Sequence, residues 1–251
     1  MSGYRKKQDA FGQALYSAFI AGQDCFIVER DDGCIYDGGG LKTYFAGYNK
    51  WPAREKEAMK HVRGKVLDLG AGAGRHALYL QKKGYPVTAT DNSPLAVQLC
   101  MERGVKKALC LPIEETSKLG TVYDTVLMMC NNFGLFGNKR KAKKLLKQLF
   151  KKTAPDAGII AESYEYKTPF FREYIKRNKK LGREPGDFRA RIRYGKFCTP
   201  WFNYFRATKH EMADILKGTV WKIELIIQKT EPSYIAIIRK ANNFKPEGKC
   251  L

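Results

Sequence analysis

Val66-Leu67-Asp68-Leu69-Gly70-Ala71-Gly72-Ala73-Gly74 decides the fold of this 251-residue chain, because an apolar run holding one acid leads directly into three alternating glycines. A second apolar run, Tyr85-Pro86-Val87-Thr88-Ala89-Thr90-Asp91, ends in another carboxylate. This spacing predicts a strand, a glycine-rich turn, a helix and a second strand. Such turns hold adenosine-containing cofactors in α/β proteins, so the sequence indicates a cofactor site.

The glycine spacing also indicates which cofactor is favoured. The dinucleotide fingerprint G-x-G-x-x-G/A needs a small residue where this chain has Arg75. The observed order, D-x-G-x-G-x-G, resembles motif I of the class I S-adenosylmethionine (SAM) methyltransferases. The resemblance covers about residues 53–240, and within that family the chain is similar to small-molecule methyltransferases of the ubiquinone-biosynthesis type. A ligand-free turn and a site for NAD or another nucleotide are the alternatives.

The resemblance implies a SAM site at the carboxyl ends of the strands, where open α/β sheets bind ligands. Gly70 and Gly72 lack Cβ atoms where a ligand must approach the backbone, and Asp91 offers two acceptor oxygens for the ribose hydroxyls. By the same resemblance, residues 111–114 bracket the adenine and residues 130–134 lie near the sulfonium. The expected cofactor-binding residues are Asp68, Gly70, Ala71, Gly72, Gly74, Asp91, Asn92, Pro112, Ile113 and Cys130.

The hydrophobic pattern predicts an α/β fold of alternating strands and helices, and the resemblance implies a doubly wound, mostly parallel seven-stranded sheet whose last strand is antiparallel. The run from Tyr123 to Cys130 is almost continuously apolar, as is typical of a strand buried on both faces. Strands are expected at 65–69, 86–91, 107–111, 123–130, 158–163, 219–228 and 233–239, and core helices at 75–83, 94–103, 139–152 and 209–217.

Three units are expected along the chain. Residues 1–52 form an N-terminal helical extension and cap, residues 53–164 and 209–240 form the SAM-binding core, and residues 165–208 form a lid inserted after the fifth strand. Within the lid, a helix near 169–180 precedes two antiparallel strands, 188–194 and 197–205.

The net charge of +21 is concentrated in two segments. Residues 139–152 carry eight Lys/Arg and no acid, and residues 165–208 carry twelve against four acids. A focused positive field attracts anions, although a solvated surface is the alternative explanation. Strand alternation places Arg189, Arg191 and Arg193 on one face. The acceptor-binding residues expected from these patterns are Tyr44, Tyr48, Arg191 and Arg193.

Methyl transfer from SAM is an in-line displacement, in which much of the catalysis comes from alignment. A general base is needed only for an acceptor that arrives protonated. Asn131, Glu162, Tyr164 and His210 are the candidates, each with a purely structural alternative. Cys130 lacks the neighbouring proline that marks the nucleophile of RNA cytosine-C5 methyltransferases, and residues 131–134 depart from the Asn/Asp-Pro-Pro-Tyr signature.

Seven cysteines without a C-x-x-C pair support neither a disulfide framework nor a zinc site, so no metal is expected. No apolar run reaches the roughly 20 residues that span a bilayer, so a cytoplasmic protein without membrane contact is expected. The expected function is methyl transfer from SAM to a small molecule, for which an anion is a candidate, leaving S-adenosylhomocysteine (SAH). The alternatives are a methyltransferase acting on RNA or another macromolecule through the basic lid, and a non-catalytic SAM-binding protein.

Overall fold

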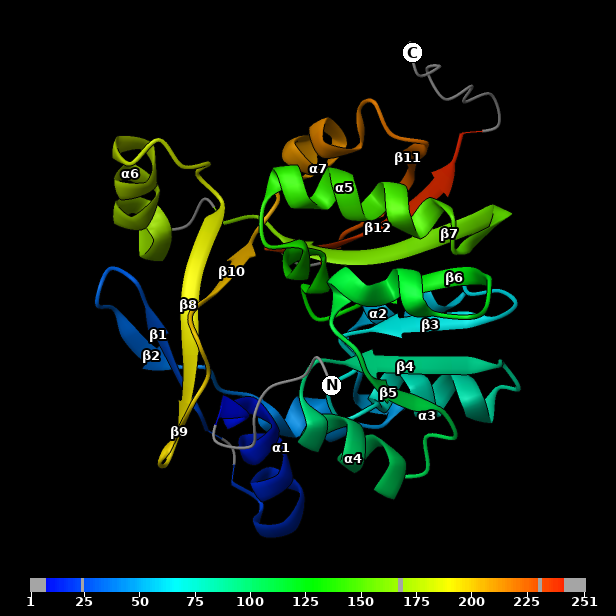
Figure 1. The fold of residues 1–251 in the computed structure, drawn as a ribbon, viewed down its shortest axis with the longest axis horizontal. Helices are drawn as coiled ribbons and strands as arrows, with labels where there is room; N and C mark the ends of the chain where they lie inside the picture. Colours follow the sequence, from blue (N-terminus) through cyan, green and yellow to red (C-terminus); the bar gives the residue numbers. More distant parts are fainter. Residues whose placement is uncertain (1–7, 24, 167–168, 230–231, 242–251) are drawn as a thin grey trace.

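The computed structural model describes residues 8–23, 25–166, 169–229 and 232–241, which form two β-sheets. The larger sheet has seven strands in the order β11-β12-β7-β6-β3-β4-β5 (Figure 1). Pairing is parallel from β5 to β7, and β12 runs antiparallel to both of its neighbours. This arrangement confirms the predicted sheet. Its strands are β3 (Val66–Leu69), β4 (Val87–Asp91), β5 (Ala108–Cys110), β6 (Tyr123–Met128), β7 (Thr153–Tyr164), β11 (Trp221–Ile227) and β12 (Ser233–Lys240).

Helices cover both faces of this sheet. On one face, α5 (Lys139–Phe150) and α7 (Lys209–Leu216) bury residues such as Leu146 and Ile215 in an apolar cluster. On the other face, α2 (Ala53–Met59) and α3 (Arg75–Lys82) bury Met59 and Leu80. α5 buries its apolar stripe as its 3.6-residue periodicity predicts, which leaves most of its basic side chains at the surface.

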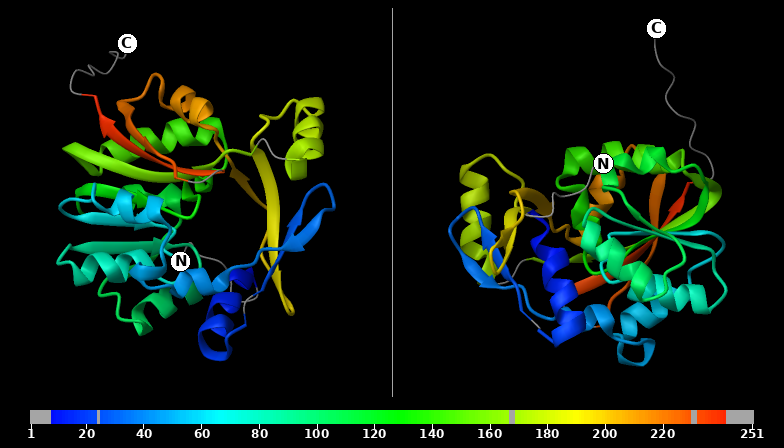
Figure 2. Two further views of the ribbon diagram at one scale, coloured as in Figure 1. Left: turned by 180° about the vertical axis from the view of Figure 1, so that it is seen from behind. Right: turned by 60° about the horizontal axis from the view of Figure 1, so that its bottom comes forward.

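The second sheet stands across the carboxyl edge of the first and has the order β10-β8-β1-β2 (Figures 1 and 2). Its strands are β1 (Ile27–Arg30), β2 (Ile35–Asp37), β8 (Asp187–Tyr194) and β10 (Phe202–Phe205), and β9 (Phe197–Cys198) pairs with β8. All of these pairs are antiparallel. Besides the predicted helix, the N-terminal segment supplies two strands, which join those of the insertion. The three-unit division itself stays a prediction.

Ion pairs join the N-terminal strands to the insertion. Asp31, which follows β1, accepts hydrogen bonds from Arg177 at 3.1 Å and Arg183 at 2.7 Å. Arg177 belongs to α6 (Arg172–Lys180), within the helix predicted near 169–180. On β1 itself, Glu29 accepts from both Arg191 and Arg193 of β8. These contacts fix the insertion to a segment more than 140 residues away in the chain.

The N-terminal helix α1 (Ala10–Ala21) packs on α4 (Pro94–Glu102). Asp9 is fully buried, and its carboxylate accepts from the amide of Gly12 and from that of Leu95, both at 3.0 Å. One carboxylate thus satisfies a free amide in the first turn of each helix. α1 and the short 3-10 helix η2 (Leu41–Phe45) pack in one apolar cluster with Ala73 of the glycine loop. A second short 3-10 helix, η3 (Tyr48–Lys50), follows η2.

No helix in the described ranges is long and apolar enough to cross a bilayer. The same part of the chain holds no group of three side chains of the types that bind metals.

Candidate functional site

The glycine loop after β3 requires glycine for two separate reasons. Gly70, Gly72 and Gly74 all have positive φ angles, of 72°, 54° and 75°. A Cβ atom at Gly70 would lie only 2.6 Å from the side-chain nitrogen of Asn132. That nitrogen donates to the carbonyls of Leu69 at 2.9 Å and Gly70 at 2.8 Å. Asn132, which sequence reasoning did not single out, therefore holds the loop from the end of β6.

Asp91 lies at the end of β4 as predicted and is directed at the loop. Its two oxygens accept from the amide of Gly72 at 2.9 Å and of Ser93 at 3.0 Å. Each carboxylate oxygen can still accept a further hydrogen bond, which is what a ribose diol needs. Burial raises the pKa of Asp91, and the two amide donors oppose that effect.

Asp68 is the second buried acid of the loop, with 2% of its surface exposed. One of its oxygens has no hydrogen-bond partner among the described residues. Burial, together with the nearby Asp91 carboxylate, raises the pKa of Asp68 to about 7. A buried acceptor without a donor is costly, so this oxygen is suited to a ligand that brings one.

The turn that ends β6 is strained. Cys130 and Asn131 have φ angles of 57° and 62°, values that residues with side chains rarely adopt. Glu162 of β7 accepts from the Cys130 amide at 2.6 Å, and the hydroxyl of Tyr204 in β10 donates to the Asn131 carbonyl at 2.6 Å. One contact from each sheet therefore holds the turn. The Asn131 side-chain oxygen is buried, and no described residue donates a hydrogen bond to it.

A buried network lies behind this turn. Arg75 donates to both oxygens of Glu55, at 3.0 and 2.9 Å, and to the Cys130 sulfur at 3.2 Å. His76 lies 3.0 Å from the same carboxylate. Burial raises the pKa of the Cys130 thiol to about 12, so Cys130 is protonated near neutral pH and is a poor nucleophile. The Glu162 carboxylate is fully engaged by protein donors, because besides the Cys130 amide it accepts two hydrogen bonds from Arg54, both at 3.1 Å.

The other candidate residues separate into near and distant ones. Tyr44 rests on the loop, since a Cβ at Gly72 would lie 3.1 Å from its ring. Tyr48 instead stacks on Tyr79 with ring centres 4.4 Å apart. The His210 side chain is 84% exposed and lies next to Asp214 on α7, so it faces solvent.

Some predicted residues serve the framework. The Ala71 amide donates to the Thr90 carbonyl at 3.0 Å, and the Asn92 carbonyl lies 3.8 Å from the Cys110 sulfur. Pro112 precedes the 3-10 helix η4 (Ile113–Lys118) that follows β5. Their roles at a cofactor stay predictions, as does that of Tyr164 at the end of β7.

Comparison with known proteins agrees with this geometry. Residues 66–156 match the family model described as a methyltransferase domain. Over 96% of its length the chain is similar to the crystal structure of a SAM-dependent methyltransferase from Bacteroides fragilis in complex with SAH, with a TM-score of 0.83, 24% identity and 98% of that chain covered. The fold is that of the class I methyltransferases. The fold predicted from the glycine loop is thereby confirmed.

The curated relatives that the chain matches are similar to it over only part of its length. Glycine/sarcosine N-methyltransferase of Halorhodospira halochloris is 22% identical over 130 residues, which are 46% of this chain and 48% of that protein. Hemagglutinin 1 of Eikenella corrodens is 42% identical over 57 residues, 22% of this chain and 19% of that protein. The chain thus spans about half or less of the curated relatives that it matches.

The residues of this class I methyltransferase fold fit SAM on three observations. A Cβ atom would fill the cradle at Gly70, both oxygens of Asp91 retain acceptor capacity, and the free oxygen of Asp68 can accept from an ammonium group. Asp68, Asp91 and the loop amides are therefore the groups that would hold it.

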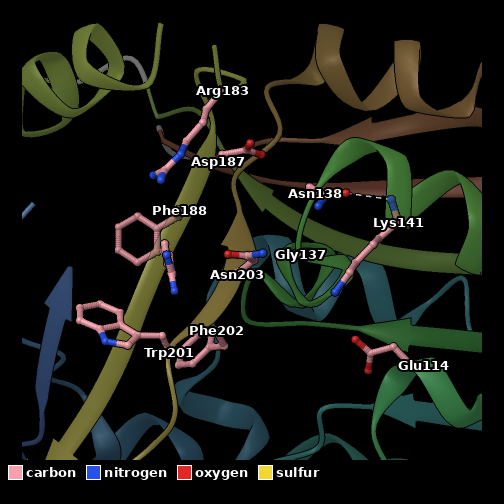
Figure 3. A pocket seen from close by; sticks show the side chains of 11 residues that line it. Glu114, Gly137, Asn138, Lys141, Arg183, Asp187, Phe188, Trp201, Phe202 and Asn203 are labelled. Atoms are coloured by element: carbon pink, nitrogen blue, oxygen red, sulfur yellow. Dashed lines mark hydrogen bonds between the residues drawn. The ribbon is translucent and has the colours of Figure 1, made fainter. Parts of the chain in front are cut away.

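A cavity of about 590 Å³ opens between the second sheet and the start of α5 (Figure 3). Lys141 of α5 and Arg189 of β8 both line it, and Trp201 forms part of the wall on the side of the second sheet. Arg191 and Arg193, by contrast, pair with Glu29, so their charges are compensated within the sheet. The lining residues are Glu114, Gly137, Asn138, Lys141, Arg183, Asp187, Phe188, Arg189, Trp201, Phe202 and Asn203.

Proposed function

We propose that this protein transfers a methyl group from SAM to a small, anionic acceptor. The observation that carries the proposal is the strained turn at Cys130 and Asn131, held directly beside a glycine loop with two buried acids. Strain of this kind, about 1–3 kcal/mol for each residue, persists where the surroundings enforce it and is concentrated at functional sites. The methyltransferase family model and the SAH-bound structural relative support the methyl-transfer part of this proposal.

The residues would act mainly by positioning. Bound SAM would supply an electrophilic methyl group on a sulfonium. Asp91 would hold the ribose, Asp68 would accept from the ammonium, and the turn at Cys130 and Asn131 would lie beside the reacting centre. Alignment of the acceptor can then supply most of the catalysis. Glu162 serves this turn as a positioning residue, because all three of its contacts stabilise the local structure.

A small acceptor is supported by the second sheet and the N-terminal helix, which stand over the carboxyl edge where the acceptor would enter. An anionic acceptor is supported by the cavity, where Lys141 and Arg189 have no carboxylate within ion-pair distance among the described residues. Uncompensated cations in a cleft raise the local concentration of anions.

A macromolecular acceptor is the second candidate, and one observation favours it. Arg140, Lys144 and Lys147 lie exposed along α5 at helical spacing, next to Lys141 at the cavity. Such a row suits a phosphate backbone, and binding through it would weaken steeply with salt. Fluorescence anisotropy of a labelled RNA oligonucleotide at 50 and 200 mM salt separates this function from the first, since a small acceptor predicts no RNA binding at either concentration.

Calorimetric titration of SAM, SAH and NAD tests the cofactor assignment. Binding of SAM and SAH without NAD is expected, and Asp91→Ala should abolish it because the ribose acceptors are lost. Asp156→Ala removes an exposed carboxylate and serves as the matched control, with unchanged affinity expected. Absence of SAH binding to the wild-type protein would overturn the proposed function. Binding of both sulfur ligands without turnover on any acceptor would favour a non-catalytic SAM-binding protein.

A further inference from the structure

Arg206 follows β10 and its guanidinium is packed among aromatic rings. The guanidinium carbon lies 4.1 Å from the ring centre of Phe171, 4.9 Å from that of Phe188 and 5.3 Å from that of Tyr164. Its backbone is fixed as well, because the Arg206 amide donates to the Gly186 carbonyl at 2.9 Å. The rings stabilise the positive charge in part, and they hold the guanidinium at one place beside the end of β7.

Arg206 differs from its neighbours in charge compensation. Arg191 and Arg193 pair with Glu29, and Arg177 and Arg183 pair with Asp31. At the carboxyl edge of the core, Arg54 pairs with Glu162 and Arg75 with Glu55. Within the part of the chain that the structure describes, Arg206 has no carboxylate within ion-pair distance, and its Nε atom is buried without an acceptor.

The position of Arg206 connects it with the proposed methyl-transfer site. Tyr204, two residues earlier, donates to the carbonyl of the strained Asn131. Burial raises the pKa of Tyr204, and the positive charge of Arg206 lowers it. Cys130 and Glu162 also raise this pKa, each by less than Arg206 lowers it. Burial likewise raises the pKa of Tyr36, and the charge of Arg206 and a side-chain hydrogen bond with Arg206 oppose that rise. The guanidinium therefore lies within electrostatic reach of the groups around the turn.

A partly buried cation without a carboxylate is unfavourable unless an anion completes its contacts. We propose that Arg206 binds the anionic group of the methyl acceptor, a carboxylate or a phosphate, and so holds the acceptor beside the turn at Cys130 and Asn131. This inference rests on the proposed function. A guanidinium suits the task because it can donate two parallel hydrogen bonds to either group. The rings of Phe188 and Tyr164 would lie next to the bound anion, which favours an acceptor with a planar apolar part.

Calorimetric titration of the SAH-loaded protein with benzoate, inorganic phosphate and uncharged benzamide tests the proposal. The wild-type protein should bind at least one of the two anions and should bind benzamide at least tenfold more weakly. Benzoate or phosphate binding identifies which anionic group the site accepts. Equal affinity for benzoate and benzamide, or no binding of either anion, would overturn the proposal.

The variant Arg206→Gln should weaken anion binding at least tenfold and leave SAH affinity unchanged. Arg172→Gln is the matched control, since it removes an exposed guanidinium of α6 that does not line the cavity. A loss of anion binding in Arg172→Gln equal to that in Arg206→Gln would contradict the assignment. If Arg206→Gln fails to bind SAH, the variant Arg206→Lys takes its place. It should bind the anion several-fold more weakly than wild type, because lysine keeps the charge and loses the planar fork. Unchanged anion affinity in Arg206→Lys would refute the proposal. Absence of SAH binding to the wild-type protein would instead be a failure of the proposed function.

Discussion

The substitution Asp68→Asn should change how the stability of the unliganded protein depends on pH. Asp68 is buried, with one oxygen unpartnered and the Asp91 carboxylate nearby, and its pKa is raised to about 7. The ordinary aspartate pKa of about 3.9 applies to the unfolded chain, so the difference corresponds to about 4 kcal/mol. The native state then holds more protons than the unfolded state between pH 4 and pH 7, and the contribution of Asp68 to stability falls as pH rises through that window.

Urea unfolding of the wild-type protein and Asp68→Asn at pH values from 4.5 to 8.5 measures the effect. The variant has no ionisable group at position 68, so its free energy of unfolding should rise relative to wild type by several kcal/mol from the acid to the alkaline end. A constant offset between the two proteins is compatible with the prediction, because only the pH-dependent part reports ionisation. Asp156→Asn controls for loss of an exposed carboxylate. Parallel pH profiles of wild type and Asp68→Asn would show that the buried carboxyl does not titrate in this range.

Three further outcomes are expected. Gly70→Ala should lower the free energy of unfolding in urea by about 3 kcal/mol, because a positive φ of 72° costs roughly 1–2 kcal/mol and the new Cβ displaces the Asn132 side-chain amide. Gly84→Ala is the control: its φ is 89° and its surroundings are open, so it should lose only the backbone contribution. Asp9→Ala should lower stability by about 2 kcal/mol in the same assay, since two helices each lose a hydrogen bond to a first-turn amide. Iodoacetamide at pH 8 should alkylate exposed Cys25 well before Cys130, as followed by mass spectrometry; equal rates would contradict the burial of the Cys130 thiol.

Much of the core could be predicted because its signals are local. The strand around Asp68, the glycines and Asp91 are set by residues within 25 positions of one another, and each has one dominant physical explanation. The buried face of α5 could be predicted just as directly, from the helical spacing of its apolar residues. The antiparallel last strand followed from the resemblance to a family, and the register of β12 on β7 agrees with it.

The second sheet could not be predicted from the same kind of signal. Alternation correctly placed Arg191 and Arg193 on one face of a strand, yet Glu29, which neutralises both, lies more than 160 positions away. Partner choice between distant strands depends on side chains that no local window contains. Asn132 was missed for a related reason, since an asparagine after a strand is common and only the folded chain shows that its amide reaches the loop carbonyls.

The turn at Cys130 and Asn131 links the two sheets energetically, because each sheet supplies one of its hydrogen bonds. Tyr204→Phe should therefore weaken SAH binding, since loss of the bond to the Asn131 carbonyl costs about 1 kcal/mol and lets the turn relax; that energy corresponds to about fivefold in affinity. Tyr234→Phe is the matched control, because its hydroxyl also donates to a carbonyl, that of Ala207 at 2.7 Å, within the core and in no contact with the turn. Calorimetry should show reduced SAH affinity for Tyr204→Phe alone, while urea unfolding shows a comparable loss of stability in both variants. Equal SAH affinities in the two variants would mean that the geometry of the cofactor site does not depend on the second sheet.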